Sequence, residues 1–236
     1  MNFVTATDEN YFHFVYDFVE KTREVFPYAN IVIYDLGMTA EQIFLTKAMG
    51  AIYCKWNKVQ SNGKYPEGYT PRALHKPSML FHAARNLTGP IVYIDVDAYP
   101  VAHFEVPDCD VAVTMKRRDI MMLYKDTPLE EYLGRLDAGT IMFGAGEGRE
   151  LFIAKWAIDM QDDPSPSDQK SLSNVVDECH DWEKYNVTRK LEIGGDPVRV
   201  QILHEGDYNS AFLHPDAKII HKRVHENEHT PDKSTS

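Results

Sequence analysis

Residues 91–97 read Ile-Val-Tyr-Ile-Asp-Val-Asp, with Gly89-Pro90 before them and Pro100 soon after. Four consecutive residues of high strand propensity, bounded by turn residues, predict a strand buried on both faces. Such a strand would bring Asp95 and Asp97 to the carboxyl edge of a sheet, where open α/β sheets bind ligands. If the chain stays extended past Asp95, both carboxylates point to the same side. Hard oxygen ligands there suit Mn²⁺ or Mg²⁺, although an acidic pair after a strand can also be a solvated turn.

The segments on either side of this strand alternate between strand and helix patterns. Strands are predicted at residues 3–6, 31–34, 51–54, 111–115, 140–143, 198–203 and 218–221. Helices are predicted at 9–26, 39–49 (with a capping box at Thr39 and Gln42), 77–87 (with Pro77 first), 147–161 and 168–178. Residues 56–72 and 116–135 are predicted to be a loop and a mixed connection. This order predicts one α/β domain over residues 1–225, with a central, mostly parallel sheet flanked by helices, and a polar, disordered tail at 226–236.

Composition places the chain among ordinary globular proteins and disfavours some partners. Its 236 residues are 43% hydrophobic and 26% charged, and the formal net charge is −11. That charge argues against a nucleic-acid or anionic-membrane partner. No apolar run approaches the roughly 20 residues of a membrane span, and the first ten residues lack signal-peptide features. The cysteines at 54, 109 and 179 form no disulfide framework, so we expect a reduced, cytoplasmic location. The lack of a long apolar run predicts no integral membrane segment.

Short motifs in a shared order make the chain resemble GT-A-type, nucleotide-sugar-dependent glycosyltransferases, particularly the glycogenin and bacterial galactosyltransferase-like group. The matching stretches are Val4–Thr7, Tyr34–Gly37, His75–Pro77, Tyr93–Asp97, Leu136–Phe143, Trp156, Ser167–Gln169, Asp207–Asn209 and Ile219–Lys222. The resemblance implies a Rossmann-like GT-A fold, a nucleotide-sugar donor expected to be UDP-linked, and transfer with retention. The acceptor, whether a glycan, a lipid-linked group or a protein, is left open.

The same resemblance implies a metal centre and cations around a diphosphate. Asp95 and Asp97, with His221, would hold Mn²⁺ (or Mg²⁺), and the ion would bridge the donor's phosphates. Negative charge grows on the leaving nucleoside diphosphate, which a metal and nearby cations stabilise. Lys76 and Lys222 are the candidate cations, Lys76 because a lysine at a helix N-terminus adds to an anion site. His221 as a strand-end histidine, and both lysines as solvated charges, remain the alternatives.

Further residues are assigned by the resemblance alone. Base and ribose contacts fall to Thr5, Ala6, Thr7 and Asp35, and donor contacts to Val96, Ala138, Gly139 and Asn209. Asp168 and Gln169 would lie near the reacting carbon and Asp137 would face the donor sugar, which makes these three the candidate catalytic residues. Plain turn chemistry would also explain Thr5 and Thr7, and helix-dipole complementarity would explain Asp168.

Two departures from the family pattern bear on function. Asp137 stands where the family usually has Asn, which puts the expected sugar contact in doubt, and Lys-Arg-Val-His follows His221 in place of Gly, Lys, Pro and Trp. They leave room for a non-catalytic nucleotide-sugar or glycan-binding domain. A haloacid-dehalogenase-like Mg²⁺-dependent phosphatase also ends a strand in Asp-x-Asp. That family prefers Thr or Val where this chain has Ala98 and Tyr99, and its motif lies near the start of the chain.

Overall fold

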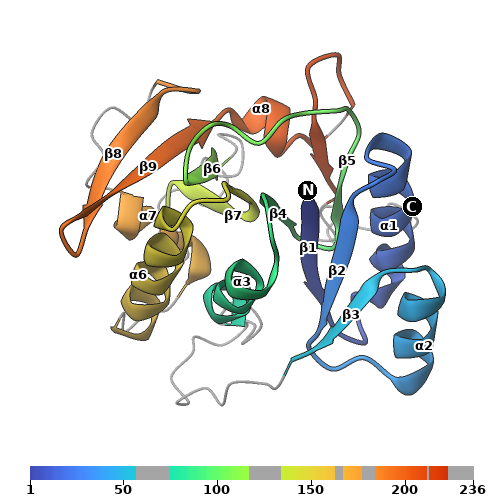
Figure 1. The fold of residues 1–236 in the computed structure, drawn as a ribbon. Coiled ribbons are helices and arrows are strands. Elements are labelled where there is room, and N and C mark those ends of the chain that lie inside the picture. Colours follow the sequence, from blue (N-terminus) through green and yellow to red (C-terminus); the bar gives the residue numbers. More distant parts are fainter. Residues whose placement is uncertain (57–74, 117–133, 163–166, 177–183, 212, 223–236) are drawn as a thin grey trace, which may run out of the picture.

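The computed structural model describes residues 1–56, 75–116, 134–162, 167–176, 184–211 and 213–222 (Figure 1). Nearly all of the predicted loop at 56–72 and of the connection at 116–135 lies outside these residues. Cys179 and the predicted polar tail at 226–236 lie outside them as well. Cys54 and Cys109 are free thiols.

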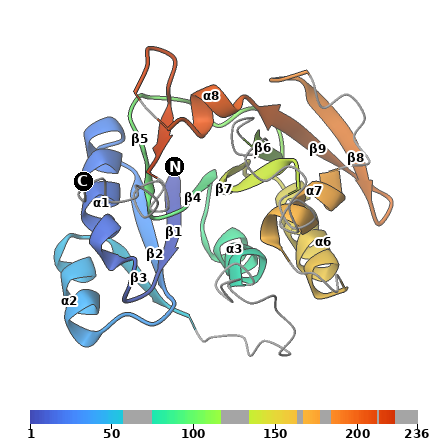
Figure 2. The same cartoon turned by 180° about the vertical axis from the view of Figure 1, so that it is seen from behind.

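An eight-stranded sheet forms the centre of the molecule. Its strands are β1 (Asn2–Thr7), β2 (Asn30–Asp35), β3 (Ile52–Lys55), β4 (Ile91–Ile94), β6 (Val111–Met115), β7 (Leu136–Phe143), β8 (Thr188–Ile193) and β9 (Asp196–Leu203). The order across the sheet is β3-β2-β1-β4-β7-β6-β9-β8, so β3 and β8 lie at opposite edges, as both views show (Figures 1 and 2). Four of the seven adjacent pairs are parallel, and β7 runs antiparallel to both of its neighbours. The predicted mixed α/β class with a large central sheet is confirmed.

A second, two-stranded sheet pairs distant parts of the chain. It consists of β5 (Ala98–Pro100) and β10 (Ile219–His221), which run antiparallel with Ala98 opposite His221. Because β5 follows the acidic pair directly, this pairing brings the last described strand next to the carboxyl end of β4. The pairing therefore decides which late residue can reach Asp95 and Asp97.

The helices cover both faces of the large sheet. They are η1 (Phe12–Phe14), α1 (Val15–Val25), α2 (Ala40–Ala48), α3 (His75–Asn86), α6 (Gly148–Asp162), α7 (Asp168–Val176) and the short α8 (Glu205–Tyr208). The capping box predicted at Thr39 and Gln42 is present, with hydrogen bonds in both directions. Pro77 was predicted to be the first residue of its helix, but it is the third. It still lies in the first turn, where a backbone N–H has no intrahelical acceptor, so its missing N–H costs the helix no hydrogen bond.

Strand β4 is buried on both faces, as its composition predicts. Ile91 and Tyr93 belong to the apolar cluster that α3, α6 and α7 form on one face of the sheet. Val92 and Ile94 belong to the cluster that α1 forms on the other. All four residues are at most 3% exposed. A strand held this tightly fixes the position of whatever follows it.

The structure adds to or changes the sequence-based expectations at three places. The chain does not stay extended past Asp95: a turn forms, in which the Ala98 N–H donates to the Asp95 carbonyl at 2.9 Å. Residues 136–139, which the sequence-based prediction left outside the strand at 140–143, belong to β7 itself. Strands β5 and β8 were not predicted, since β5 has three residues and β8 lies at an edge with polar side chains.

Candidate functional site

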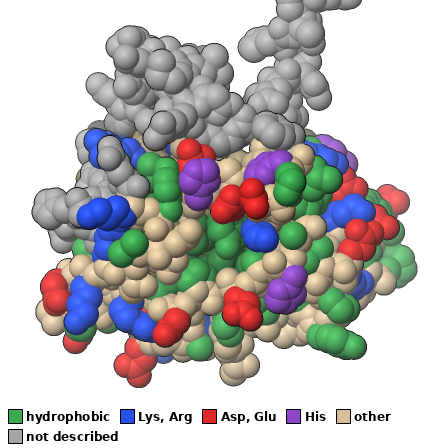
Figure 3. Space-filling view, turned by 90° about the horizontal axis from the view of Figure 1, so that it is seen from above, with side chains coloured by type: hydrophobic (Ala, Val, Ile, Leu, Met, Phe, Trp, Pro, Cys, Tyr) green, Lys and Arg blue, Asp and Glu red, His purple; other side chains and the backbone are tan. Residues whose placement is uncertain are grey.

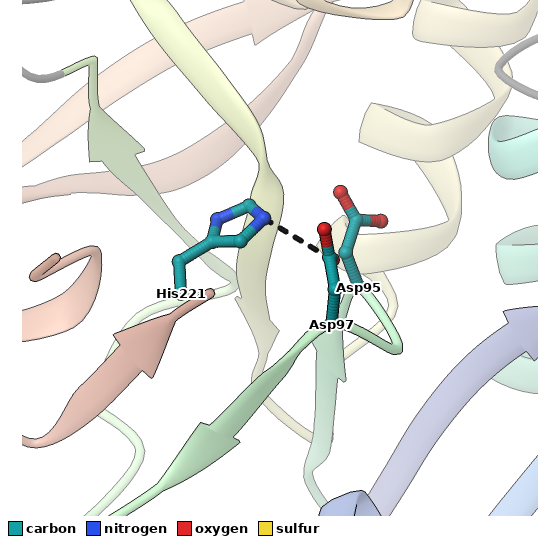
Figure 4. Close-up of side chains that lie close together, drawn as sticks. All are labelled: Asp95, Asp97 and His221. Atoms are coloured by element: carbon teal, nitrogen blue, oxygen red, sulfur yellow. Dashed lines mark ion pairs between the residues drawn. The ribbon is translucent and has the colours of Figure 1, made fainter. Parts of the chain in front are cut away.

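Asp95, Asp97 and His221 meet at the carboxyl end of β4. One ligand atom from each lies within 4.8 Å of the others. The acids come from the turn between β4 and β5, and His221 comes from the end of β10, with its ring facing Asp97 (Figure 4). His221 Nε2 is 3.2 Å from Asp97 Oδ1, and both side chains are largely buried. Two carboxylates and an imidazole are a donor set that Mn²⁺ accepts readily.

Gly139 leaves the space in which these three side chains can converge. A Cβ at this position would lie 2.9 Å from His221 Cε1, 3.0 Å from Asp95 Oδ2 and 2.8 Å from Asp137 Oδ1. The backbone of β7 arches here, because Val113 on β6 pairs with Ile141 while the next residue, Thr114, pairs with Asp137. The arch lets the Gly139 carbonyl accept the Asp95 N–H at 2.8 Å. The residues therefore fit a small cation, since any side chain at 139 would occupy its surroundings.

The ring of His221 is held from behind by two buried side chains. Its Nδ1 lies 3.0 Å from Asn209 Oδ1, and Asn209 Nδ2 donates to Asp137 Oδ2. The other oxygen of Asp137 accepts the Gly139 N–H at 2.6 Å. Histidine ligands usually have such a second hydrogen-bond partner, which fixes the ring orientation.

Lys76 connects the acidic pair to a third carboxylate. Its Nζ lies 3.1 Å from Asp95 Oδ1 and 2.9 Å from Asp168 Oδ2, and it donates to the Ala138 carbonyl at 2.9 Å. The Tyr93 hydroxyl donates to the same Asp95 oxygen at 2.5 Å. Oδ1 of Asp95 is thus engaged by protein donors, while Oδ2 faces Gly139.

Burial and opposite charges act against each other in this cluster. Burial by itself would lower the pKa of Lys76, but the carboxylates of Asp168 and Asp95 raise it well above its ordinary value. Burial raises the pKa of Asp95, and Lys76 opposes that rise. Burial would also lower the pKa of His221, but Asp97 and then the other acids raise it to about 9. At neutral pH the metal-free site therefore holds a lysine and a histidine cation among its carboxylates.

A cavity of about 230 Å³ opens beside this cluster. Its wall includes predicted residues from β1, α3, the acidic turn and α7, namely Ala6, Thr7, Lys76, Asp95, Val96, Asp97 and Asp168. It also includes residues that the sequence did not single out for the site, namely Asp8, Tyr11, Leu36, His75, Met79 and Tyr93. Tyr93 could have been found from strand alternation, because it lies two residues before Asp95 on the same face.

Some predicted site residues are placed elsewhere. Asp35 is not among the described residues that line the cavity; its carboxylate accepts the N–H groups of Gly37 and Met38 and the hydroxyl of Tyr53. Thr5 is fully buried, and its hydroxyl has no hydrogen-bond partner among the described residues. Lys222 Nζ lies 2.7 Å from Asp17 on α1, so the structure does not place its amine beside Lys76.

Gln169 is adjacent to Asp168 at the start of α7 but faces a different partner. Its side-chain oxygen accepts from Lys116, which is 3% exposed, and its N–H donates to Asp168 Oδ1 at 2.9 Å. The carbonyl of Asp168 accepts the Trp156 Nε1–H at 3.1 Å. The start of α7 is thus anchored on two sides, which holds Asp168 toward Lys76.

Solved structures with a similar arrangement of elements include several glycosyltransferases. The galactosyltransferase LgtC, in complex with donor and acceptor sugar analogs, gives a TM-score of 0.55 at 12% sequence identity, covering 90% of this chain and 74% of that one. The apo bifunctional glycosyltransferase WbbM gives 0.53 at 15% identity, covering 94% of this chain and 45% of that one. The chain has a GT-A glycosyltransferase fold.

Apo GlyE of Streptococcus pneumoniae TIGR4, another glycosyltransferase, gives a TM-score of 0.50 at 11% identity, covering 75% of this chain and 43% of that one. Identities this low establish a common GT-A fold and leave the chemistry to the residues themselves. No protein-family model matches the sequence, and no curated protein sequence matches it significantly. Among the described helices, none combines the length and apolar character needed to cross a bilayer.

Proposed function

We propose that this chain is a metal-dependent glycosyltransferase that moves a sugar from a nucleotide-diphosphate sugar, with UDP as the expected nucleotide, to an acceptor. The observation that carries the proposal is the convergence of Asp95, Asp97 and His221 around the space left by Gly139, beside a cavity on a GT-A fold. Bound Mn²⁺ would supply a Lewis acid for the diphosphate of the donor. Mg²⁺ is the alternative ion, although the imidazole ligand favours Mn²⁺.

Lys76 is the protein's own cation for the leaving group. It is 8% exposed, lines the cavity and already neutralises Asp95 and Asp168. A buried cation placed before the reaction stabilises developing negative charge without reorganising solvent. We therefore assign Lys76 to the diphosphate, and leave Lys222 to its ion pair with Asp17 unless donor binding releases it.

Asp168 is the acid that we place nearest to the reacting sugar. It is 6% exposed, lines the cavity, and is held by Lys76 on one side and by the Gln169 N–H on the other. We assign it to orienting the donor sugar or the acceptor, with Gln169 as its neighbour on α7. Retention of configuration is the expected stereochemical outcome, as the sequence resemblance implies.

The test is turnover of a panel of nucleotide sugars with and without Mn²⁺. Wild-type protein should release sugar or transfer it only with the ion, and Asp95→Asn and Asp97→Asn should each lower kcat/KM by about 100-fold or more, the loss expected when a charge stabiliser is removed. Asp196→Asn, a charge change at the exposed start of β9, should have no effect.

Each alternative predicts a different result in the same assays. Release of phosphate from phosphomonoesters, with no use of any nucleotide sugar, would replace the proposal with a phosphatase. Tight, Mn²⁺-dependent binding of UDP without sugar release or transfer would replace it with a binding domain. Undiminished turnover in both aspartate variants would contradict the metal assignment.

A further inference from the structure

A buried chain of hydrogen bonds leads from Asp137 to the ring of His221. Asp137 Oδ2 accepts from Asn209 Nδ2, and Asn209 Oδ1 lies 3.0 Å from His221 Nδ1. Asn209 is fully buried and Asp137 is 3% exposed. The two residues come from distant elements, β7 and the end of α8, so their contact is made only in the folded chain.

The chemistry of these groups gives the chain a direction. An ionised carboxylate has only acceptors, so Asn209 must turn its NH₂ group toward Asp137 and its oxygen toward His221. That oxygen can only accept, so Nδ1 of the ring must carry a hydrogen, in the neutral ring as in the protonated one. The other ring nitrogen, Nε2, is the one that faces Asp97 and the centre of the cluster.

We propose that Asp137 is a positioning residue, which fixes the amide of Asn209 and through it makes His221 present Nε2 to the metal ion. This inference rests on the metal centre of the proposed function. It also gives a role to the departure at this position. An asparagine at 137 could either donate to or accept from Asn209, and would leave the amide of Asn209 without an imposed orientation. Asp137 is then buried behind the ligand, and is not itself a contact to the donor sugar.

The first experiment measures Mn²⁺ affinity by calorimetry. Asp137→Asn, which keeps the size of the side chain, should weaken binding by about 10- to 100-fold, as changes behind a metal ligand typically do. Loss of a nearby negative charge would also weaken binding, so the matched control is Asp207→Asn. Asp207 lies two residues from Asn209 on α8, and its variant should bind Mn²⁺ as the wild type does.

A double-mutant cycle separates positioning from charge. If Asp137 acts through Asn209, then Asp137→Asn should have little further effect on Mn²⁺ affinity in an Asn209→Ala background. If Asp137 acts by its charge alone, the two losses should add. Additive losses would overturn the inference while leaving the metal centre of the proposed function in place.

A second experiment needs no metal. In ¹⁵N-histidine-labelled, metal-free protein, the His221 Nδ1–H should give a slowly exchanging proton signal, because it is buried and hydrogen-bonded. Asp137→Asn should remove or broaden this signal, and Asp207→Asn should preserve it. An unchanged signal in Asp137→Asn would overturn the inference even if the variant binds Mn²⁺ weakly. Failure of the wild type to bind Mn²⁺, with the signal behaving as expected, would instead count against the proposed function alone.

Discussion

At the scale of single residues, Gly139 is where the site tolerates least change. Its missing side chain leaves the space between Asp95, Asp137 and His221. Gly139→Ala should therefore displace the ligands and weaken Mn²⁺ binding by at least about 10-fold, with a stability loss of about 1–3 kcal/mol from overpacking. Calorimetric titration and urea unfolding measure the two effects.

The matched control for that variant is Gly146→Ala. A Cβ there would lie 3.0 Å from Asp110 Oδ1, which equals the longest of the three contacts at Gly139 and involves a residue outside the cluster. Its Mn²⁺ affinity should equal that of the wild type. Equal affinities for both alanine variants and the wild type would contradict the placement of the ion beside Gly139.

His221 makes metal binding depend on pH. Its pKa, raised to about 9 in the metal-free protein, means that the ring carries a proton at neutral pH, which the ion must displace. Mn²⁺ affinity should therefore rise with pH from 6 to 8, by at most tenfold per pH unit for this one proton. Titrations in two buffers of different ionisation enthalpy should show proton release on binding.

His221→Gln serves as the control for that dependence. The variant should bind Mn²⁺ more weakly, and the part of the pH dependence that comes from the ring should disappear. A wild-type affinity that stays flat between pH 6 and 8 would contradict a ring that must lose a proton before it binds the ion.

At the scale of elements, one buried arginine ties the helix before β4 to the end of β7. Arg149, near the start of α6, donates to the carbonyls of Ala84, Leu87, Gly89 and Gly144, and is 6% exposed. Arg149→Met would leave these carbonyls with fewer donors and should lower the free energy of unfolding by about 3 kcal/mol, since hydrogen bonds to charged groups are among the stronger ones.

Chemical denaturation measures this loss, with Arg85→Met as its control. Arg85 lies on α3 with an exposed side chain and a 3.9 Å contact to Glu150, so its loss should change stability by less than about 0.5 kcal/mol. Similar stabilities for the two variants would contradict the role of Arg149 as a link between the elements.

The elements also show which parts of the fold can be predicted from sequence. Strand β4 could be predicted because its four apolar residues pack on both faces, and α2 because its capping box is local. Residues 136–139 were left out of the predicted strand because Asp, Ala and Gly are depleted in strands, whereas pairing of Leu136 and Asp137 with β6 extends the strand. Strand β8 was missed because its alternation of polar residues at an edge carries little apolar signal.

The candidate site divides in the same way. Asp95 and Asp97 are two positions apart at the end of a predictable strand, so their proximity could be predicted from the local sequence alone. The contact between Asp137 and Asn209 joins residues 72 positions apart and depends on how α8 approaches β7. Family resemblance supplied His221 as a candidate, but its hydrogen-bond partners came only from the structure.

At the scale of the whole molecule, a bound ion would connect the eight-stranded sheet to the two-stranded sheet. The acids follow a strand of the large sheet, whereas His221 ends a strand of the small one. Mn²⁺ should therefore slow hydrogen exchange most at the backbone amides of β5 and β10. Exchange at the amides of the β8–β9 hairpin at the far edge should change least, because this hairpin can open locally while the metal site stays folded.

Hydrogen exchange followed by mass spectrometry measures this distribution, with Asp97→Asn as the variant that should show no response to the ion. Uniform slowing over all described strands would point to a general stabilisation, and would contradict a bridge between the two sheets.

The charge of the whole chain does not locate the site: acidic, basic and histidine side chains are interspersed on the face in Figure 3, and the formal net charge is −11.

Because His221 lies on the last described strand, β10, its pairing with β5 makes the metal site a late part of the fold to be completed during synthesis. The acidic turn emerges more than a hundred residues before His221, so a nascent chain can build all eight strands of the large sheet while its cation ligands remain incomplete. A chain that stops before residue 219 would keep those strands yet lack the imidazole. Metal capture would then report that residues 219–221 have paired with β5.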